Sequence, residues 1–365
     1  MWMFLDDSLV QITPSDANVR SALEQLLYAV GRGEHVVAAN PATARRLLEV
    51  DLSPVPQTVL RQVLTMAPDL LARLKTTSFR IRVVAEGALP LRVDASEWSL
   101  PLDWIRKNGV PTSFILGENT RDAKLFRIAA THHGALVRTG NSICIDIGSG
   151  GGADTPGVLA TEIAAKRRFV LCITDSDKSC PTAPQNHTSN ECARISKENG
   201  WIVMHLALNE REVENLLPIN LIEDVVTSLS PSDLDGRLDA LRGIAAKKAS
   251  AWAFLDLKEG TPLNALFGAC SNFWMDLKEH PICKSGSDNR CIEAGKCIAK
   301  SKDECKCLIA PPLGQKIVDH VIDYLEKCST HAIAKRSSTS ANAERWMEIG
   351  ALVSEWGAAT PKLRS

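Results

Sequence analysis

Acidic side chains follow three of the four apolar segments that are predicted to be β-strands in the middle of the chain. They are, in chain order, Glu118, Asp122, Asp175, Asp177, Glu212 and Glu214. Because ligands collect beyond the carboxyl ends of parallel strands, we expect these carboxylates to meet at one edge of a sheet. Converging carboxylates raise each other's pKa unless a cation lies between them. Oxygen ligands favour Mg²⁺ or Mn²⁺, and these ions typically act on phosphate esters.

The spacing within each motif bears on this hypothesis. Glu118 and Asp122 are four residues apart, and with Thr120 opening a helix they are expected on one face of its first turn. Asp175 and Asp177 alternate by two, so in an extended segment both carboxylates point the same way. The alternative is that acidic residues at strand ends cap helices and remain solvated. Three such motifs in order favour the metal site.

Two further features lie close to the predicted chemistry. The glycine run 148–152 could bring backbone N–H groups to a phosphate, or it could form a tight turn between a strand and a helix. Lys258 follows the apolar run 252–255 and could neutralise charge that develops on a phosphate, the alternative being a solvated surface lysine. His132 is expected at the end of a helix, where a cationic side chain interacts favourably with the helix dipole.

Five cysteines are concentrated in one short polar segment, residues 283–307. They are Cys283, Cys291, Cys297, Cys305 and Cys307. Four thiolates can hold a structural Zn²⁺ tetrahedrally, although no C-x-x-C spacing occurs here. Labile or disordered thiols and disulfides are the alternatives to zinc.

The elements that must position the acidic residues form an alternating β/α pattern between residues 111 and 218. The expected strands cover 113–116, 142–146, 169–174 and 202–206, with helices over 120–132, 156–166 and 189–199. This alternation is typical of βαβ units and a parallel sheet. We therefore predict an α/β fold with a four-stranded parallel sheet flanked by helices.

The remaining regions contain less chemistry. Residues 1–110 are predicted to be mixed and mostly helical, with one strand at 79–84. Residues 219–329 are predicted to be helical with the cysteine-rich insert 283–307. Residues 330–365 are predicted to be a Ser/Thr/Ala-rich linker followed by a terminal helix that contains Trp346 and Trp356.

Taken together, the acidic motifs resemble those of a known domain. Glu118-x-x-x-Asp122, Asp175-x-Asp177 and Arg211-Glu-Val-Glu-Asn-Leu-Leu are similar to the TOPRIM domain of the OLD (overcoming lysogenization defect) nucleases and related phage-defence effectors. The resemblance implies a TOPRIM-like sheet in which Glu118, Asp122, Asp175, Asp177 and Glu214 hold Mg²⁺. Glu212 is the alternative to Glu214, and the family's downstream lysine corresponds to Lys258.

The function implied by this resemblance is Mg²⁺-dependent cleavage of phosphodiester bonds in DNA or RNA by an effector of bacterial antiviral defence. The chain has no G-x-x-x-x-G-K-[ST] loop, so an ABC-type ATPase would have to be a separate partner. The alternative is a non-catalytic Mg²⁺-binding regulatory or ATPase-partner subunit. The sequence leaves open whether the chains form a homo-oligomer.

Composition sets the outer limits of these interpretations. The 42 Lys and Arg residues nearly balance 43 Asp and Glu residues, so a nucleic-acid contact must come from a local patch. The longest apolar run, 169–173, is too short to cross a bilayer, which predicts no membrane association. Cysteines beside expected strands are typical of reduced thiols, so a cytoplasmic location is expected.

Overall fold

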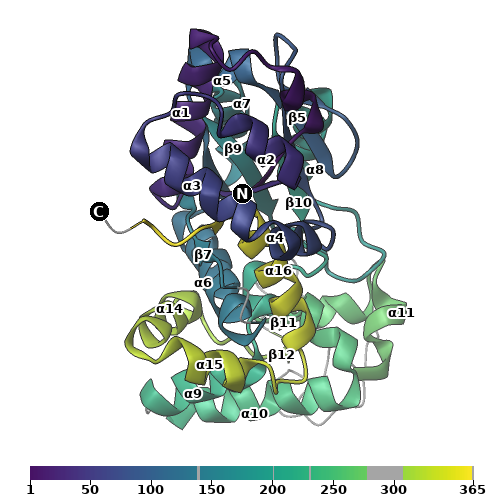
Figure 1. Cartoon of the computed structure of the whole chain (residues 1–365). Helices are drawn as coiled ribbons and strands as arrows, with labels where there is room; N and C mark the ends of the chain where they lie inside the picture. The colour runs from purple at the N-terminus through teal and green to yellow at the C-terminus, as the bar shows by residue number, and fades with distance from the viewer. Residues whose placement is uncertain (138–139, 200, 230–231, 278–306, 364–365) are drawn as a thin grey trace. The chain divides into compact units, whose positions relative to one another are not determined.

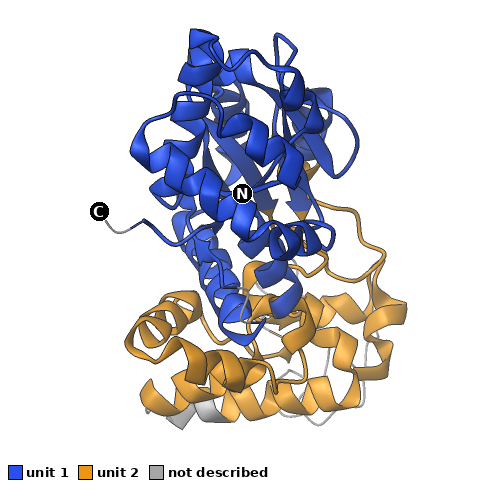
Figure 2. Ribbon diagram, in the orientation of Figure 1, with its two compact units in different colours: residues 1–173, 191–206, 347–365 blue, residues 174–190, 207–346 orange. Residues whose placement is uncertain are grey.

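The computed structural model describes residues 1–137, 140–199, 201–229, 232–277 and 307–363. The chain folds into two compact units (Figure 2). Unit 1 contains Met1–Ile173, Glu191–Leu206 and Met347–Ser365, and unit 2 contains Thr174–Asn190 and Ala207–Trp346. The chain therefore passes between the units several times, and the predicted domain 111–218 is shared between them.

The first sheet of unit 1, sheet A, has five strands in the order β2-β1-β3-β5-β4. Figure 1 labels β5 of this sheet and the helices α1 to α5 around it. Its strands are β1 (Trp2–Leu5), β2 (Val36–Ala39), β3 (Arg80–Val84), β4 (Leu91–Arg92) and β5 (Glu97–Pro101). The accompanying helices are α1 (Ala17–Gly31), α2 (Pro41–Leu47), α3 (Pro54–Thr65), α4 (Ala67–Leu74) and α5 (Leu102–Asn108). All pairings are parallel except that of β4 with β5.

Sheet A adds four strands, β1, β2, β4 and β5, to an N-terminal region for which the sequence predicted only the strand at 79–84. Of these, β1 and β2 are each four residues long. All four residues of β2 are buried. A strand that is buried along its whole length shows no alternation of polar and apolar residues, so periodicity does not distinguish it from part of a buried helix.

Sheet B is parallel throughout and has the order β10-β9-β6-β8. Its strands are β6 (Thr112–Gly117), β8 (Asp146–Ser149), β9 (Arg168–Thr174) and β10 (Val203–Ala207). The associated helices are α6 (Thr120–Val137), α7 (Thr155–Ala165) and α8 (His187–Glu198). The prediction of a four-stranded parallel sheet with helices between its strands is confirmed. The register places Gly117 beside Ile173, so β6 and β9 end at nearly the same level.

The second strand of sheet B lies later in the chain than predicted. Residues 142–146 were expected to form it, but β7 (Ser142–Ile143) pairs antiparallel with β13 (Ala358–Ala359), and β8 takes the place in sheet B. The pairing of β7 with a segment more than 200 residues away is a tertiary contact that local sequence patterns do not contain.

Trp356, at the end of α16 (Ala343–Trp356), links the two sheets of unit 1. Its ring centroid lies 4.8 Å from that of Phe79 and 6.1 Å from that of Trp98 in β5. Its indole N–H donates to the carbonyl of Phe169 in β9 at 3.0 Å. Because this ring is fully buried and its N–H is satisfied, it contributes strongly to the core that holds sheet B in place.

Unit 2 is mostly helical. Its α-helices are α9 (Ile219–Leu229), α10 (Ser232–Lys247), α11 (Ser271–Trp274), α14 (Ile317–Lys327) and α15 (Thr330–Ser337). Its 3-10 helices include η3 (Val213–Leu216) and η4 (Ala249–Phe254), and β11 (Thr261–Pro262) pairs antiparallel with β12 (Leu308–Ala310). The first residues of the predicted linker instead form the helix α15. This helix buries one face, made of Ile333, Ala334 and Ser337.

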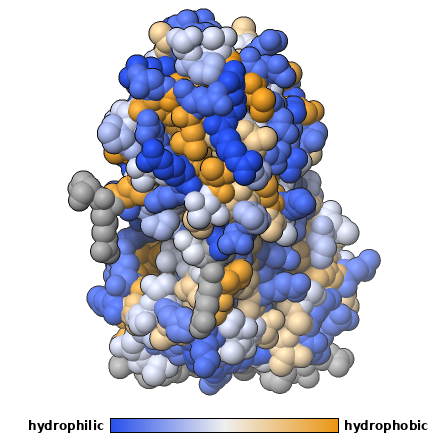
Figure 3. Space-filling model, viewed as in Figure 1, coloured by the Kyte–Doolittle hydropathy of each residue, from blue (hydrophilic) through white to orange (hydrophobic). Residues whose placement is uncertain are grey.

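Within the described part of the chain, none of the helices combines the length and the apolar character that a membrane crossing requires. Hydrophilic side chains cover most of the face drawn in Figure 3, and hydrophobic side chains show between them in smaller patches.

Candidate metal centre

The loop that follows β9 carries Asp175 and Asp177 and is held by the serine between them. Ser176 is fully buried, and its hydroxyl donates to the carbonyl of Glu210 at 2.6 Å. The backbone N–H groups of Ser176 and Asp177 donate to the carbonyl of Arg211 at 3.2 and 2.9 Å. These bonds join the two acidic segments of unit 2, those after β9 and after β10, and fix their spacing.

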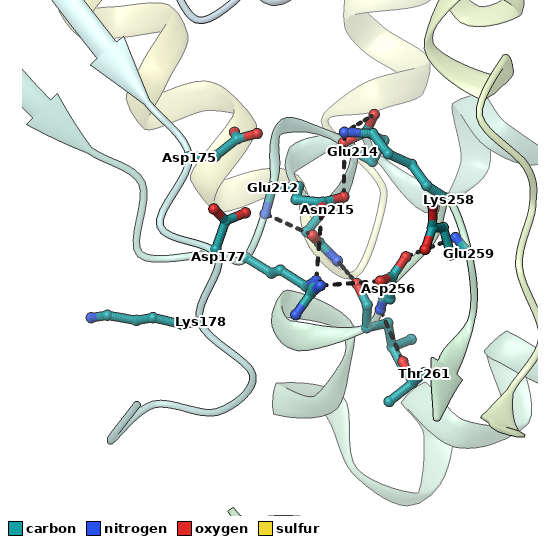
Figure 4. Close-up of polar contacts among 12 residues, drawn as sticks. Asp175, Asp177, Lys178, Glu212, Glu214, Asn215, Asp256, Lys258, Glu259 and Thr261 are labelled. Carbon is teal, nitrogen blue, oxygen red and sulfur yellow. Dashed lines mark hydrogen bonds and ion pairs between the residues drawn. The ribbon is translucent and has the colours of Figure 1, made fainter. Parts of the chain in front are cut away.

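The backbone at Asp177 departs from the extended path that the sequence suggested. Its φ is 53°, in the left-handed region, where aspartate is one of the residue types found most readily. Asn186 stabilises this turn, because its side-chain amide donates to Asp177 Oδ2 at 2.7 Å and to the carbonyl of Asp175 at 3.3 Å. In Figure 4 the carboxylates of Asp175 and Asp177 nevertheless project to the same side of the loop.

The segment after β10 is fixed by Asn215. Its Oδ1 accepts a hydrogen bond from the backbone N–H of Glu212 at 3.0 Å. Its side-chain amide donates to the carbonyls of Trp252 and Leu255 at 2.7 and 2.9 Å. One buried asparagine thus joins the two glutamates to the segment that leads to Lys258. Glu212 and Asn215 also form a capping box, which the residue types did not predict because the usual pattern is Ser or Thr followed by Glu or Gln.

Asp256 shapes the turn that presents Lys258. Its Oδ1 accepts from the N–H of Glu259 at 2.7 Å, and its carbonyl accepts from the N–H of Gly260 at 2.9 Å. Its Oδ2 accepts from the guanidinium of Arg211 at 3.0 Å. The turn closes at Gly260, whose φ of 90° suits glycine. Asp256 and Arg211 are therefore positioning residues that our sequence analysis did not assign.

Lys258 lies between the two glutamates. Its Nζ is 3.1 Å from Glu214 Oε1 and 3.4 Å from Glu212 Oε2, and Figure 4 shows its side chain reaching toward Glu214. The side chain of Glu214 is 3% exposed and that of Glu212 is 11% exposed. The structure therefore brings Glu212, Glu214 and Lys258 into one ionic cluster, so neither glutamate is simply a solvated surface group.

The pKa shifts in this cluster reflect competition between burial and charge. Burial raises the pKa of Glu212, and the neighbouring Glu214 adds to that effect while Lys258 opposes it. Burial by itself would lower the pKa of Lys258, but the negative charges of Glu214, Glu212 and Asp175 outweigh it, so the pKa lies above its ordinary value. The site thus favours a positive charge between its carboxylates.

Glu118 and Asp122 belong to unit 1, where they flank the start of α6. Asp122 Oδ2 accepts a hydrogen bond from the N–H of Asn119 at 3.2 Å, and Asn119 Oδ1 accepts from the N–H of Asp122 at 3.1 Å. This reciprocal pair caps the helix and gives the largely buried Asp122 a structural role. Glu118 lies two residues before the helix, which begins at Thr120 as predicted. The sharing of one ion by Glu118 and the aspartates stays a prediction.

The structure favours a tight turn for the glycine run 148–152. The N–H groups of Gly150 and Gly152 donate to the carbonyls of Gly117 and Glu118 at 2.8 and 2.9 Å. The N–H of Gly151 donates to the hydroxyl of Ser149 at 3.3 Å. Because these three N–H groups already donate to acceptors within the protein, they are not directed toward a phosphate.

His132 and the cysteines also differ from expectation. Helix α6 continues to Val137, so His132 is not at its end as expected. The side chain of His132 is buried, and this burial lowers its pKa to about 4. Cys283, Cys291, Cys297 and Cys305 lie outside the described residues, while Cys307 is buried and its carbonyl accepts from the N–H of Leu263. Cys180 and Cys270 form a disulfide, whereas our sequence analysis favoured reduced thiols.

Comparisons of the chain with protein-family models, with curated proteins and with solved structures find no match.

Proposed function

We propose that Asp175, Asp177, Glu212 and Glu214, the acidic cluster of unit 2, bind Mg²⁺ or Mn²⁺ and that the protein hydrolyses phosphodiester bonds in DNA or RNA. The observation that carries this proposal is the pair of buried glutamates that share one lysine, fixed by hydrogen bonds to the Asp175–Asp177 loop. Burying several carboxylates together is costly unless they bind a cation, so this arrangement points to a function.

The ligand types in the acidic cluster fit a hard divalent ion. All four side chains offer carboxylate oxygens, which Mg²⁺ and Mn²⁺ prefer to sulfur ligands. The raised pKa of Glu212 indicates that its charged form lacks full compensation in the protein alone. A divalent ion near Glu212 and Glu214 would supply the missing positive charge.

In this proposal the residues of the cluster have distinct tasks. Asp175 and Asp177 bind the ion, and Glu212 and Glu214 complete its ligands or orient them. Lys258, whose ammonium lies between the glutamates, would neutralise negative charge on the phosphate oxygens. A bound Mg²⁺ would lower the pKa of an attacking water and stabilise the leaving oxygen.

The TOPRIM resemblance supports the same reaction class. The resemblance also implies that Glu118 is a metal ligand. It also supports a role as an effector of antiviral defence, with a separate ABC-type ATPase as a partner.

The test is cleavage of plasmid DNA and of total RNA by the full-length protein, with Mg²⁺, with Mn²⁺ and with EDTA. We expect cleavage that depends on the metal and falls at least 100-fold in Asp175→Asn, on the order of the loss when one group that stabilises transition-state charge is removed. The matched control is Asp239→Asn, which alters an exposed aspartate of the same unit and should keep full activity.

One observation favours a second candidate function. Lys258 already places one positive charge between Glu212 and Glu214 without a metal, which would suit a non-catalytic Mg²⁺-binding regulatory subunit or an ATPase-partner subunit. Full cleavage activity in Asp175→Asn would refute the catalytic assignment. Binding of Mg²⁺ without cleavage of either nucleic acid would support the regulatory subunit.

A further inference from the structure

Three side chains that can bind a soft metal ion converge within sheet B and its covering helix, in unit 1. Cys172 lies in β9, Cys192 in α8 and His205 in β10. One ligand atom from each lies within 4.8 Å of those of the other two. The acidic cluster described above contains none of these residues.

The local fold explains the convergence. Strands β9 and β10 are neighbours in sheet B, and α8 is the helix that connects them along the chain. A parallel crossover of this kind packs its helix against one face of the sheet. Cys172 and His205 must face that helix, because their ligand atoms lie close to the thiol of Cys192.

We propose that Cys172, Cys192 and His205 form a zinc site. Zn²⁺ binds cysteine thiolates and histidine nitrogen in proteins, and Cys₂His with a fourth ligand from solvent is a known ligand set. Binding would release one proton from each thiol, and the two thiolate charges would balance the charge of the ion. A neutral complex of this kind is compatible with a buried position, where a net charge would be costly.

The surroundings of the three ligands suit this assignment. Both thiols are fully buried, whereas His205 is partly exposed. In a tetrahedral zinc site the ligand atoms are about 3.5–3.8 Å apart. The ligand atoms of Cys172, Cys192 and His205 would therefore move closer to one another by at most about 1 Å on binding zinc.

The alternative is that the two cysteines are small apolar core residues. A partly exposed histidine directed at that pair is not needed for the packing of the two buried cysteines. The site would also have a structural consequence: Cys172 lies three residues before Asp175, and Cys192 lies fifteen residues after Asp177. A metal bound to both would tie together the chain segments that enter and leave the aspartate loop.

The experiment measures zinc in the full-length protein, purified with a thiol reductant and added Zn²⁺. We expect Cys172→Ala, Cys192→Ala and His205→Gln each to lose one equivalent of zinc per chain relative to the wild type. Cys144→Ala, which removes an exposed free thiol, should retain it. Cys305→Ser/Cys307→Ser should also retain it, which separates this site from zinc that the segment 283–307 could bind.

A second readout does not depend on the folding of the three variants that remove a proposed ligand. Replacing zinc by Co²⁺ should give thiolate-to-cobalt charge-transfer absorption that Cys305→Ser/Cys307→Ser keeps. Chelation should lower the melting temperature by about 5 °C or more, because a ligand bound only to the folded state stabilises it. Equal zinc in wild type and Cys192→Ala, absence of the cobalt absorption, or a Cys172–Cys192 disulfide in the zinc-loaded protein would overturn the proposal. None of these readouts uses nuclease activity.

Discussion

At the scale of single residues, Lys258 determines how the acidic cluster tolerates burial. Its ammonium contacts both Glu212 and Glu214 and offsets part of their charge, and its side chain is itself only 31% exposed. An ammonium held in this way competes with a metal ion for the same carboxylates. Removing it should therefore alter both the stability of unit 2 and its response to Mg²⁺.

We predict that Lys258→Met lowers the free energy of unfolding in EDTA by about 1–2 kcal/mol, because it removes the ammonium between two largely buried carboxylates, of which Glu212 keeps its longer ion pair with Arg211 at 3.6 Å. This figure is below the cost of breaking a fully buried pair, because Lys258 is partly exposed. Added Mg²⁺ should then stabilise the variant more than the wild type. Urea unfolding with EDTA and with Mg²⁺ measures both effects. Lys247→Met, at an exposed lysine of α10, is the control. A response to Mg²⁺ equal to that of the wild type would argue against competition for these carboxylates.

At the scale of elements, the start of α6 shows how a carboxylate that resembles a ligand serves as a cap. Asn119 and Asp122 exchange hydrogen bonds through their side chains and backbone N–H groups. These bonds satisfy donors that the first turn of a helix otherwise leaves without partners. The geometry of Asp122 can be separated from its charge by substitution.

We predict that Asp122→Asn preserves both stability and metal-dependent cleavage, because the amide oxygen can still accept from the N–H of Asn119. Asp122→Ala should lose about 1 kcal/mol of stability, the usual cost of removing a cap. Thermal unfolding and the plasmid assay measure the two properties. If Asp122→Asn folds normally but loses cleavage, Asp122 is a metal ligand, as the TOPRIM resemblance implies.

At the scale of the whole molecule, buried histidines make stability depend on pH. His132 is 3% exposed within α6, and its pKa is lowered from 6.5 to about 4 by burial. The unfolded chain therefore binds a proton at a higher pH than the folded chain does. The free energy of unfolding is therefore unaffected by His132 above pH 6.5, where the imidazole is neutral in both states. It decreases as the pH falls from 6.5 toward 4, because only the unfolded chain binds the proton there.

We predict that lowering the pH from 7 to 5 costs the wild type about 1–2 kcal/mol more stability than it costs His132→Gln. The measurement is urea unfolding of both proteins at the two pH values. His331→Gln, at an exposed histidine of α15, should behave as the wild type. Equal pH dependence in wild type and His132→Gln would mean that His132 is not held neutral by burial.

The sequence by itself determined the parallel sheet B and most of its helices, because alternating strands and helices leave periodic patterns over long segments. It also pointed to the acidic motifs, since residue types and their position after a strand can be read locally. The tertiary structure decided which of these residues contact each other. Lys258 is more than 40 residues from Glu214 in the chain, and no local pattern places its ammonium between the two glutamates.

Other features were beyond local patterns for the same physical reason. The strands β1 and β2 are buried without alternation, and β7 pairs with β13 across most of the chain. Cys172, Cys192 and His205 do not have the short spacings of common metal motifs. Only the crossover from β9 through α8 to β10 brings their side chains together. Local sequence reports propensity and residue chemistry, whereas contacts between distant segments depend on how the buried surfaces of the elements pack.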